Sequence, residues 1–262
     1  MFTGRPAPAA LVVAALVALA AGAASAQRAV VTLGVASSLS DVARELAARY
    51  ERETGTSVQV TTGGSNTLAR QIVEGAPIDV FVSADQAQMD VAARAGRLEE
   101  GSRRDLLSNR LVVVVGPGRV DGFQRMPKGP GDLADANLRR LAMGNPESVP
   151  AGVYGRRWLE RAGVWEAVRA KVIPFPTVRA ALSAAAEGRA EAAIVYATDA
   201  RGNAAVRVAF EADEGAAPAV TYPMAVVRGR RSAAAAALAA WLRGPAARAA
   251  FEAAGFGVVD GR

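Results

Sequence analysis

The sequence predicts an α/β protein of two lobes, each with a mainly parallel sheet covered by helices on both faces, with hinge strands between the lobes. Three observations lead to this prediction. Short apolar segments alternate with segments of helical period from Val30 to about Asp85. A second alternation of the same kind begins near Leu141. Two apolar stretches of strand length, Leu111–Val115 and Val220–Val227, lie where the alternations meet, and we take them as the connecting strands.

The first alternation opens with a buried strand at Val30–Val35, which is short, apolar and β-branched. Apolar residues then recur at helical spacing from Leu39, with Ser38 or Ser40 as the expected cap and Gly55 as the expected end. The elements expected next are a strand at Val58–Thr61, a helix near Thr67–Glu74, a strand at Ile78–Val82 and a helix opened by Ser83-Ala84-Asp85.

The second alternation supplies the other lobe. Its expected elements are strands at Leu141–Met143, Lys171–Ile173, Ala192–Tyr196 and Val206–Phe210, with helices opening at Pro150 and Val178. Two helices close the chain, at Ser232–Leu242 and near Pro245–Ala254. We therefore expect residues 27–110 and 219–262 to form one lobe and residues 111–218 the other.

Several strands end in a small or hydroxyl-bearing turn that opens a helix. Right-handed crossovers place all such helix starts at the carboxyl edge of a parallel sheet, where open α/β sheets bind ligands. A helix N-terminus carries unpaired N–H groups and about half a positive charge. Turns containing Ser38, Ser65, Ala151 and Val178, if they converge, would suit a small oxyanion.

Composition excludes several classes of function. The 262 residues are 51% hydrophobic and 21% charged, which is ordinary for a globular protein. The chain has no cysteine and no histidine, so it has no disulfide, no thiolate nucleophile and no histidine base. The net charge of +6 comes from scattered arginines, and we expect a solvated surface with no nucleic-acid partner.

The N-terminus has the pattern of a cleavable signal peptide over residues 1–26. An apolar run from Ala9 to Ala21 precedes Ala24-Ser25-Ala26, a small-x-small cleavage site. The alternative is a membrane anchor, but the run is shorter than the roughly 20 residues that span a bilayer. Residue 27 is Gln, whereas a lipid anchor needs cysteine there. We expect a freely diffusing periplasmic protein and, by default, a monomer.

An ordered set of motifs then gives a family resemblance. The set comprises Ala36-Ser37-Ser38-Leu39, Asn66-Thr67-Leu68-Ala69-Arg70-Gln71-Ile72, residues 75–85, residues 109–114, Asn145-Pro146-Glu147-Ser148-Val149-Pro150-Ala151-Gly152-Val153-Tyr154, Val178-Arg179, Ile194-Val195-Tyr196 and Tyr222-Pro223-Met224-Ala225-Val226-Val227. The chain resembles, over nearly its whole length after residue 27, the periplasmic molybdate-binding proteins of ABC-type molybdate transporters.

The resemblance implies a class II periplasmic binding fold, two lobes closing on molybdate or tungstate, with no cofactor, no bare metal cation and no enzymatic activity. It implies delivery to an inner-membrane ABC permease. The implied ligand-binding residues are Ser38, Ser65, Ala151, Val178 and Tyr196. The sequence departs from the family pattern next to the second and fourth of these residues. A Gly-Gly-Ser-Asn turn around Ser65 replaces the serine run of many family members, and Pro176-Thr177 precedes Val178 where the family often has an acidic residue.

A site made only of hydrogen-bond donors suits molybdate, which is doubly charged and carries no proton near neutral pH. Three hydroxyls and two backbone N–H groups would supply those donors. Hydrogen phosphate would need an acceptor for its proton, and the implied site has no carboxylate. Sulfate differs mainly in size, so another tetrahedral oxyanion such as sulfate is the alternative ligand.

Each residue also has an ordinary structural interpretation. Ser38 and Ser65 would be helix caps, and Tyr196 a packed core aromatic. Asp79 and Asp85 are interpreted as turn and cap carboxylates. Arg70 and Arg179 are interpreted as structural residues or as residues that support the site without contacting the ligand. Another class of function is a hydrolase with Ser38 or Ser65 as nucleophile, but only Lys128 and Lys171 could serve as a lysine base and no Gly-x-Ser-x-Gly turn is present. A regulatory sensor domain is disfavoured by the signal peptide.

Overall fold

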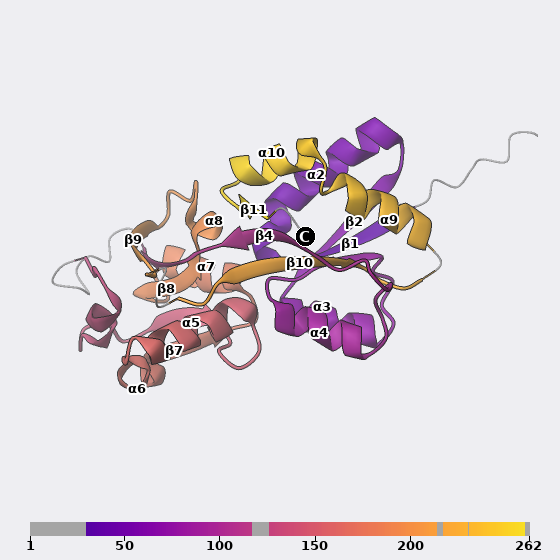
Figure 1. The fold of residues 1–262 in the computed structure, drawn as a ribbon. Coiled ribbons are helices and arrows are strands. Elements are labelled where there is room, and N and C mark those ends of the chain that lie inside the picture. The colour runs from indigo at the N-terminus through magenta and orange to yellow at the C-terminus, as the bar shows by residue number, and fades with distance from the viewer. Residues whose placement is uncertain (1–29, 117–125, 214–216, 230, 260–262) are drawn as a thin grey trace, which may run out of the picture.

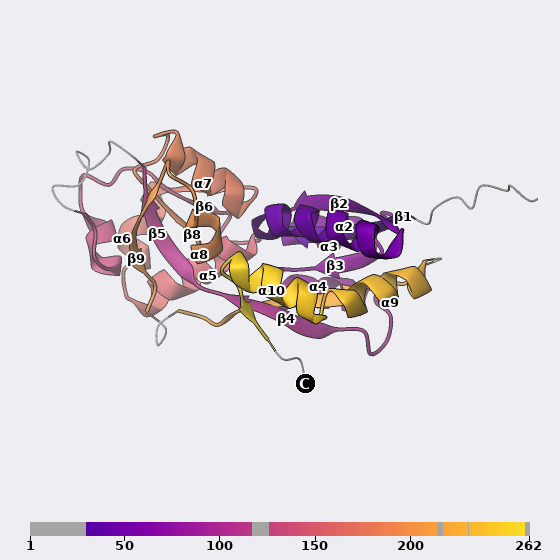
Figure 2. The same cartoon turned by 90° about the horizontal axis from the view of Figure 1, so that it is seen from above.

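The computed structural model describes residues 30–116, 126–213, 217–229 and 231–259. The predicted signal peptide, residues 1–26, lies outside them. Two lobes stand side by side, each with its own sheet (Figures 1 and 2). We call the six-stranded sheet with its helices the first lobe and the five-stranded sheet with its helices the second lobe. This confirms the α/β, two-lobed fold class.

The first lobe has the strand order β11-β4-β10-β3-β1-β2. Its strands are β1 (Val30–Ala36), β2 (Ser57–Gly63), β3 (Val80–Val82), β4 (Arg104–Asn109), β10 (Val220–Val226) and β11 (Gly257–Val258). Its helices are η1 (Ser37–Leu39), α2 (Ser40–Thr54), α3 (Ser65–Val73), α4 (Gln86–Arg94), α9 (Ser232–Trp241) and α10 (Pro245–Ala253).

The second lobe has the strand order β7-β6-β8-β5-β9. Its strands are β5 (Leu111–Val115), β6 (Leu141–Gly144), β7 (Val172–Phe175), β8 (Ala192–Tyr196) and β9 (Arg207–Glu211). Its helical segments are η3 (Pro130–Ala134), α5 (Pro150–Arg161), α6 (Trp165–Val168), η4 (Arg169–Lys171), α7 (Val178–Ala186) and α8 (Ala197–Ala200).

Both sheets are mixed, so the prediction of mainly parallel sheets is wrong. Strand β1 pairs in parallel with β2 and β3, and β6 pairs in parallel with β7 and β8. The other pairs, which involve β4, β5, β9, β10 and β11, are antiparallel. The physical reason lies in the crossings between the lobes: β5 enters the second sheet from β4 and β10 returns to the first sheet from β9, so neither strand is joined to a neighbour in its own sheet by the helical crossover of a parallel pair.

The chain crosses between the lobes at two places. One is Arg110, between β4 in the first sheet and β5 in the second. The other is the segment between Glu211 and Val220, part of which lies outside the described residues. The predicted connecting strands Leu111–Val115 and Val220–Val227 therefore correspond to strands that each begin just after a crossing and then belong to one sheet.

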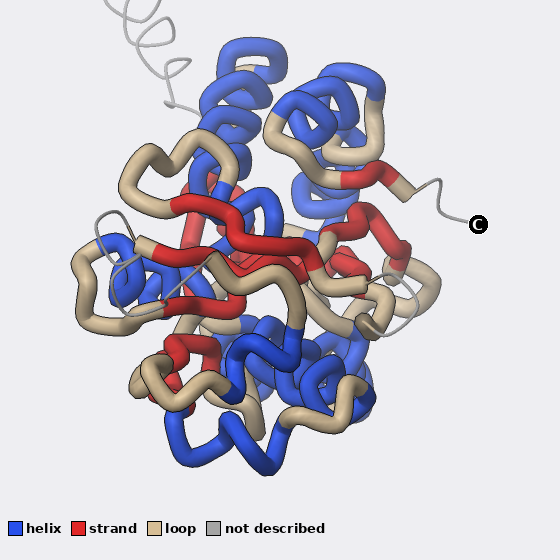
Figure 3. The backbone as a smooth tube through the Cα atoms, turned by 90° about the vertical axis from the view of Figure 1, so that its left-hand side faces the viewer, coloured by secondary structure: helices blue, strands red, loops and turns tan. Residues whose placement is uncertain are grey.

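Strand β3 illustrates how the first sheet is buried on both faces. Val80 and Val82 pack in the main core, while Phe81 points to the opposite face, against α3 and α4. Figure 3 shows the strands running through the middle of the molecule with helices above and below. None of the helices among the described residues is long and apolar enough to cross a membrane.

Candidate functional site

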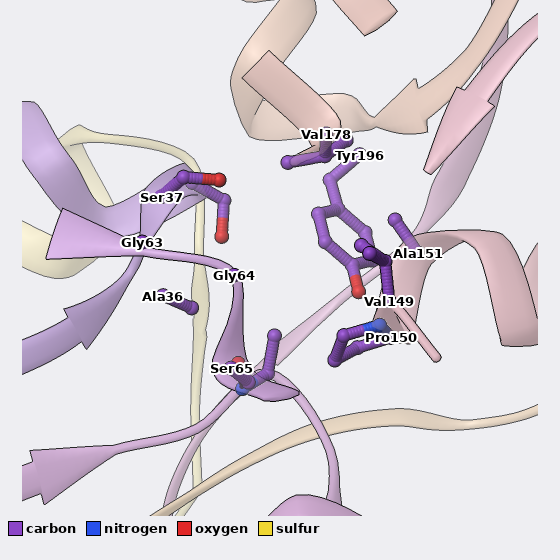
Figure 4. A pocket seen from close by; sticks show the side chains of 12 residues that line it. Ala36, Ser37, Gly63, Gly64, Ser65, Val149, Pro150, Ala151, Val178 and Tyr196 are labelled. Atoms are coloured by element: carbon purple, nitrogen blue, oxygen red, sulfur yellow. Dashed lines mark hydrogen bonds between the residues drawn. The ribbon is translucent and has the colours of Figure 1, made fainter. Parts of the chain in front are cut away.

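A small cavity lies between the two lobes, at the carboxyl ends of parallel strands from both sheets (Figure 4). The residues that line it are Ala36, Ser37, Ser38, Gly63, Gly64, Ser65, Ala84, Val149, Pro150, Ala151, Val178 and Tyr196. All five residues of the predicted site, Ser38, Ser65, Ala151, Val178 and Tyr196, are among them. The volume open to the centre of a water molecule is about 10 Å³, near the roughly 10–15 Å³ that one buried water needs, so the ligand must be small.

The topology explains why distant residues meet here. Strands β1 and β2 end next to each other at Ala36 and Gly63, because they run in parallel and in register. In the second lobe, β6 leads into the first turn of α5, and β8 ends at Tyr196. The cavity therefore collects the ends of strands that precede helices, as expected for α/β sheets.

Ser65 is not a helix cap. The N-cap of α3 is Gly64, and no side chain caps this end of the helix. The Ser65 Oγ instead accepts a hydrogen bond of 3.0 Å from the backbone N–H of Ala84. Because that amide can only donate, the hydroxyl hydrogen of Ser65 is left to donate elsewhere, and the residue faces the cavity.

Ser38 does not cap α2 either. It lies in the 3₁₀ turn Ser37–Leu39, and α2 begins at Ser40 with Leu39 as an N-cap that makes no side-chain bond. The Ser38 Oγ is buried and lies 3.0 Å from the hydroxyl oxygen of Tyr222, a residue 184 positions away. The capping alternative is thus wrong for both serines.

Tyr196 combines a core ring with an unpartnered hydroxyl. Its ring is buried and packs 5.9 Å, centroid to centroid, from the ring of Tyr222. Its hydroxyl is buried without a hydrogen-bond partner among the described residues, and in Figure 4 it points into the cavity. Burial raises the pKa of Tyr196 well above its ordinary value, so the hydroxyl stays protonated and can donate.

Ala151 and Val178 present backbone N–H groups at the starts of two helices beside the cavity. Ala151 follows Pro150 in the first turn of α5, and Val178 is the first residue of α7, where N–H groups have no partner within the helix. Close packing positions α5: a Cβ on Gly152 would overlap the carbonyl oxygen of Gly144, so only glycine lets the helix start against the end of β6.

No charged side chain is among the cavity-lining residues of the described structure. Arg179, the nearest cation in sequence, is held elsewhere: its Nη2 lies 2.9 Å from Asp41 Oδ2 and its Nε 2.7 Å from Asp199 Oδ1. Burial raises the pKa of Asp199 to about 6, against the guanidinium of Arg179, which lowers it. The interpretation of Arg179 as structural therefore agrees with its ion pairs.

The other charged residues considered in the sequence have ordinary roles. Asp85 caps α4 by accepting from the Gln88 N–H, as expected. Asp79 lies at the bend before β3, where it accepts from the Thr32 N–H at 2.7 Å and pairs with Arg231 at 3.1 Å. Arg70 is exposed and faces Glu74. Among the described residues no group of carboxylates could hold a metal ion.

The cavity is thus lined by donors and apolar groups. Sequence reasoning did not identify Ala84, whose amide donates to Ser65 Oγ, or Tyr222, whose hydroxyl contacts Ser38. A signal for both residues was present, because Ala84 and Tyr222 each lie in one of the motifs that carry the resemblance. The contact with Ala84 joins residues 19 positions apart and leaves no pattern in the sequence.

Comparisons with known proteins show the family of the chain. The family model described as "Bacterial extracellular solute-binding protein" matches residues 31–257. The molybdate-binding protein ModA of Escherichia coli (strain K12) is 36% identical over 236 residues, which cover 90% of this chain and 92% of that protein. The relatives are solute-binding transport proteins rather than enzymes, as predicted.

Solved structures show the same fold. The periplasmic molybdate-binding protein of Azotobacter vinelandii superposes with a TM-score of 0.77 at 25% identity, covering 86% of this chain and 98% of the other. The sulfate-binding protein SubI of Mycobacterium tuberculosis H37Rv superposes with a TM-score of 0.75 at 16% identity, covering 88% of each chain, which shows the fold alone. The chain belongs to the family of bacterial extracellular solute-binding proteins.

Proposed function

We propose that the protein is the periplasmic binding component of an ABC importer and that it captures molybdate or tungstate in the cavity between its lobes. The observation that carries this proposal is the buried hydroxyl of Tyr196, which has no partner among the described residues and points into a cavity that Ser38 and Ser65 also line. A buried donor without an acceptor is costly, and an anion in the cavity would remove that cost.

Five groups would hold the anion. Ser38, Ser65 and Tyr196 would donate hydroxyl hydrogens, and Ala151 and Val178 would donate backbone N–H groups. Hydrogen bonds to a charged acceptor contribute about 1.5–3 kcal/mol each, so five of them suffice for tight binding after the ordering cost. No countercharge is required, because the α5 and α7 N-termini each supply a partial positive charge.

The donor-only lining favours oxyanions without a proton. Hydrogen phosphate would bring a hydrogen that needs an acceptor, and the lining residues include no carboxylate. Leaving that hydrogen unpaired in a buried site costs about 1–3 kcal/mol. The same argument gives no preference between molybdate and tungstate.

The wider role rests on the sequence and the relatives. We propose export through the signal peptide at residues 1–26, release as a soluble periplasmic monomer without a lipid anchor, and delivery of the anion to a membrane permease. The similarity to a molybdate-binding relative over 90% of the chain supports the importer role. Sulfate is a second candidate ligand, because it is also a tetrahedral oxyanion without a proton, and a lining of donors accepts it as well.

Titration calorimetry tests the proposal on the chain from Gln27. We expect tight one-to-one binding of molybdate and tungstate, weak binding of sulfate and still weaker, but measurable, binding of hydrogen phosphate. Ser65→Ala should weaken molybdate binding at least about tenfold, whereas Ser183→Ala, at an exposed position of α7, should leave it unchanged. Tight binding of sulfate alone would make sulfate the ligand in place of molybdate. The absence of binding heat with every anion would overturn the proposal.

A further inference from the structure

A chain of hydrogen bonds lies directly behind Ser38. The hydroxyl oxygen of Tyr222, on β10, lies 3.0 Å from Ser38 Oγ and 3.2 Å from Asn109 Nδ2. Asn109 is the last residue of β4, next to the point at which the chain crosses between lobes. Tyr222 is fully buried and is not among the residues that line the cavity.

The orientation of the Asn109 amide follows from its neighbours. The backbone N–H of Arg110 donates to Asn109 Oδ1 at 2.8 Å, and an N–H can only donate, so this atom must be the amide oxygen. The NH₂ group therefore faces the other way. It donates one hydrogen to Thr198 Oγ1 at 2.8 Å and the other to the Tyr222 hydroxyl.

The direction of the next bond follows in turn. Because the Tyr222 oxygen accepts from Asn109, its own hydrogen needs an acceptor, and Ser38 Oγ is the one the described structure provides. With Tyr222 donating to Ser38, both Asn109 amide hydrogens and the phenol hydrogen have partners; the reverse direction leaves the phenol hydrogen buried and unpaired. Burial raises the pKa of Tyr222 well above its ordinary value, so it remains a donor.

We propose that Tyr222, oriented by Asn109, is a positioning residue that fixes the selectivity of the cavity for oxyanions without a proton. By donating to Ser38 Oγ, it takes one of the two lone pairs of that oxygen and keeps the Ser38 hydrogen from pointing back at Tyr222, which turns that hydrogen toward the ligand. The Ala84 amide does the same for Ser65, at 3.0 Å. This inference rests on the proposed function, since it concerns the same anion site.

Without the Tyr222 hydroxyl, Ser38 is free to rotate and to present a lone pair to the cavity. A fully deprotonated anion then loses an oriented donor. Hydrogen phosphate gains an acceptor for its hydrogen. The two effects have opposite signs, so the ratio of the two affinities reports the role of Tyr222, whereas a general loosening of the fold would weaken both anions together.

Calorimetry on Tyr222→Phe tests this under mildly alkaline conditions, where molybdate and hydrogen phosphate are both doubly charged. We expect molybdate affinity to fall about tenfold and hydrogen phosphate affinity to rise, so that their ratio falls by more than about tenfold. In an Ser38→Ala background the same substitution should change molybdate affinity less than about twofold, because the serine it orients is absent.

Two further variants control the experiment. Tyr50→Phe removes the same atom from a buried tyrosine in the last turns of α2, away from the cavity, and should change neither affinity. Asn109→Asp replaces the donating NH₂ by an acceptor, which turns the Tyr222 hydrogen away from Ser38. Its added charge opposes both dianions alike, so the affinity ratio should still fall.

The outcomes separate the two proposals. If the unmodified protein binds molybdate tightly and Tyr222→Phe leaves the ratio of molybdate to hydrogen phosphate affinity unchanged, the role of Tyr222 is refuted while the proposed function stands. If the unmodified protein binds no oxyanion, both proposals fail. A ratio that falls in Tyr222→Phe but not in Tyr50→Phe supports the inference.

Discussion

Gly64 of the first lobe touches Pro176 of the second so closely that a Cβ at position 64 would lie 2.8 Å from the Pro176 carbonyl oxygen. Gly64 precedes α3, and Pro176 lies between β7 and α7, so this contact joins the two lobes beside the cavity. The contact leaves no space for any other residue at position 64.

Gly64→Ala should therefore weaken molybdate binding about tenfold or more, because the added methyl holds the lobes apart. The backbone at Gly64 is extended, with φ of −64° and ψ of 136°, which alanine adopts without strain. The Cβ would also lie 2.6 Å from Asn66 Oδ1, but this is the end of a side chain that can turn away, so the first lobe should remain folded. Calorimetry gives the affinity. Gly131→Ala, where a Cβ meets nothing within 4 Å, is the control. Wild-type affinity in Gly64→Ala would show that this contact is not needed for binding.

Tyr196→Phe should separate stability from binding. Removal of a buried hydroxyl that has no partner among the described residues relieves a desolvation cost, so the free energy of unfolding of the ligand-free protein should stay equal or rise. Molybdate affinity should fall about 10- to 150-fold through the loss of one charge-assisted hydrogen bond. Urea unfolding and calorimetry measure the two quantities. A destabilised variant with unchanged affinity would mean that the hydroxyl belongs to the core and not to the site.

The Asp41–Arg179 ion pair joins α2 of the first lobe to α7 of the second. Asp41 is exposed, so the pair should be weak and sensitive to salt. We expect Asp41→Asn to raise the dissociation rate of molybdate about two- to fivefold at low salt, and less at high salt. Stopped-flow measurement gives the rates. Arg44→Gln, which removes the other partner of Asp41 within α2, should have no effect. The same acceleration in both variants would refute a contact between lobes as the cause.

Asp199 should give the protein a stability that depends on pH. Its pKa in the folded protein is about 6, above the ordinary 3.8, so the folded state binds the proton more tightly than the unfolded state. The contribution of Asp199 is therefore largest below about pH 4 and is lost as the pH rises through about 6. Unfolding of the wild type and of Asp199→Asn across this range should show the wild type losing stability relative to the variant. The opposite slope would mean that pairing with Arg179 outweighs burial.

Much of the fold follows from local patterns. Gly55 ends α2 with φ of 73°, as its position after the last helical turn predicts, and the strand at Ala192–Tyr196 has the predicted bounds. Strand β4 (Arg104–Asn109) was not predicted, because only its two central residues are buried and its ends are polar. Its place in the sheet comes from pairing with β10 and β11, which are distant in sequence.

In the candidate site, too, some features follow from local sequence patterns and others depend on residues that are distant in sequence. Strand ends and helix starts indicate the four turns that contain Ser38, Ser65, Ala151 and Val178, and the family resemblance picks out the individual residues within them. The direction of each hydroxyl does not follow from such rules. It depends on Ala84 and Tyr222, which lie 19 and 184 positions from the serines that they contact.

The central claim is that the cavity between the lobes is the molybdate site. Crystals of the chain from Gln27 grown with molybdate, with diffraction recorded on both sides of the molybdenum absorption edge, locate the metal atom directly. The account predicts one anomalous peak in the cavity, with the oxyanion within hydrogen-bonding distance of the Ser38, Ser65 and Tyr196 hydroxyls. A peak elsewhere on the protein, with the cavity empty, would contradict it.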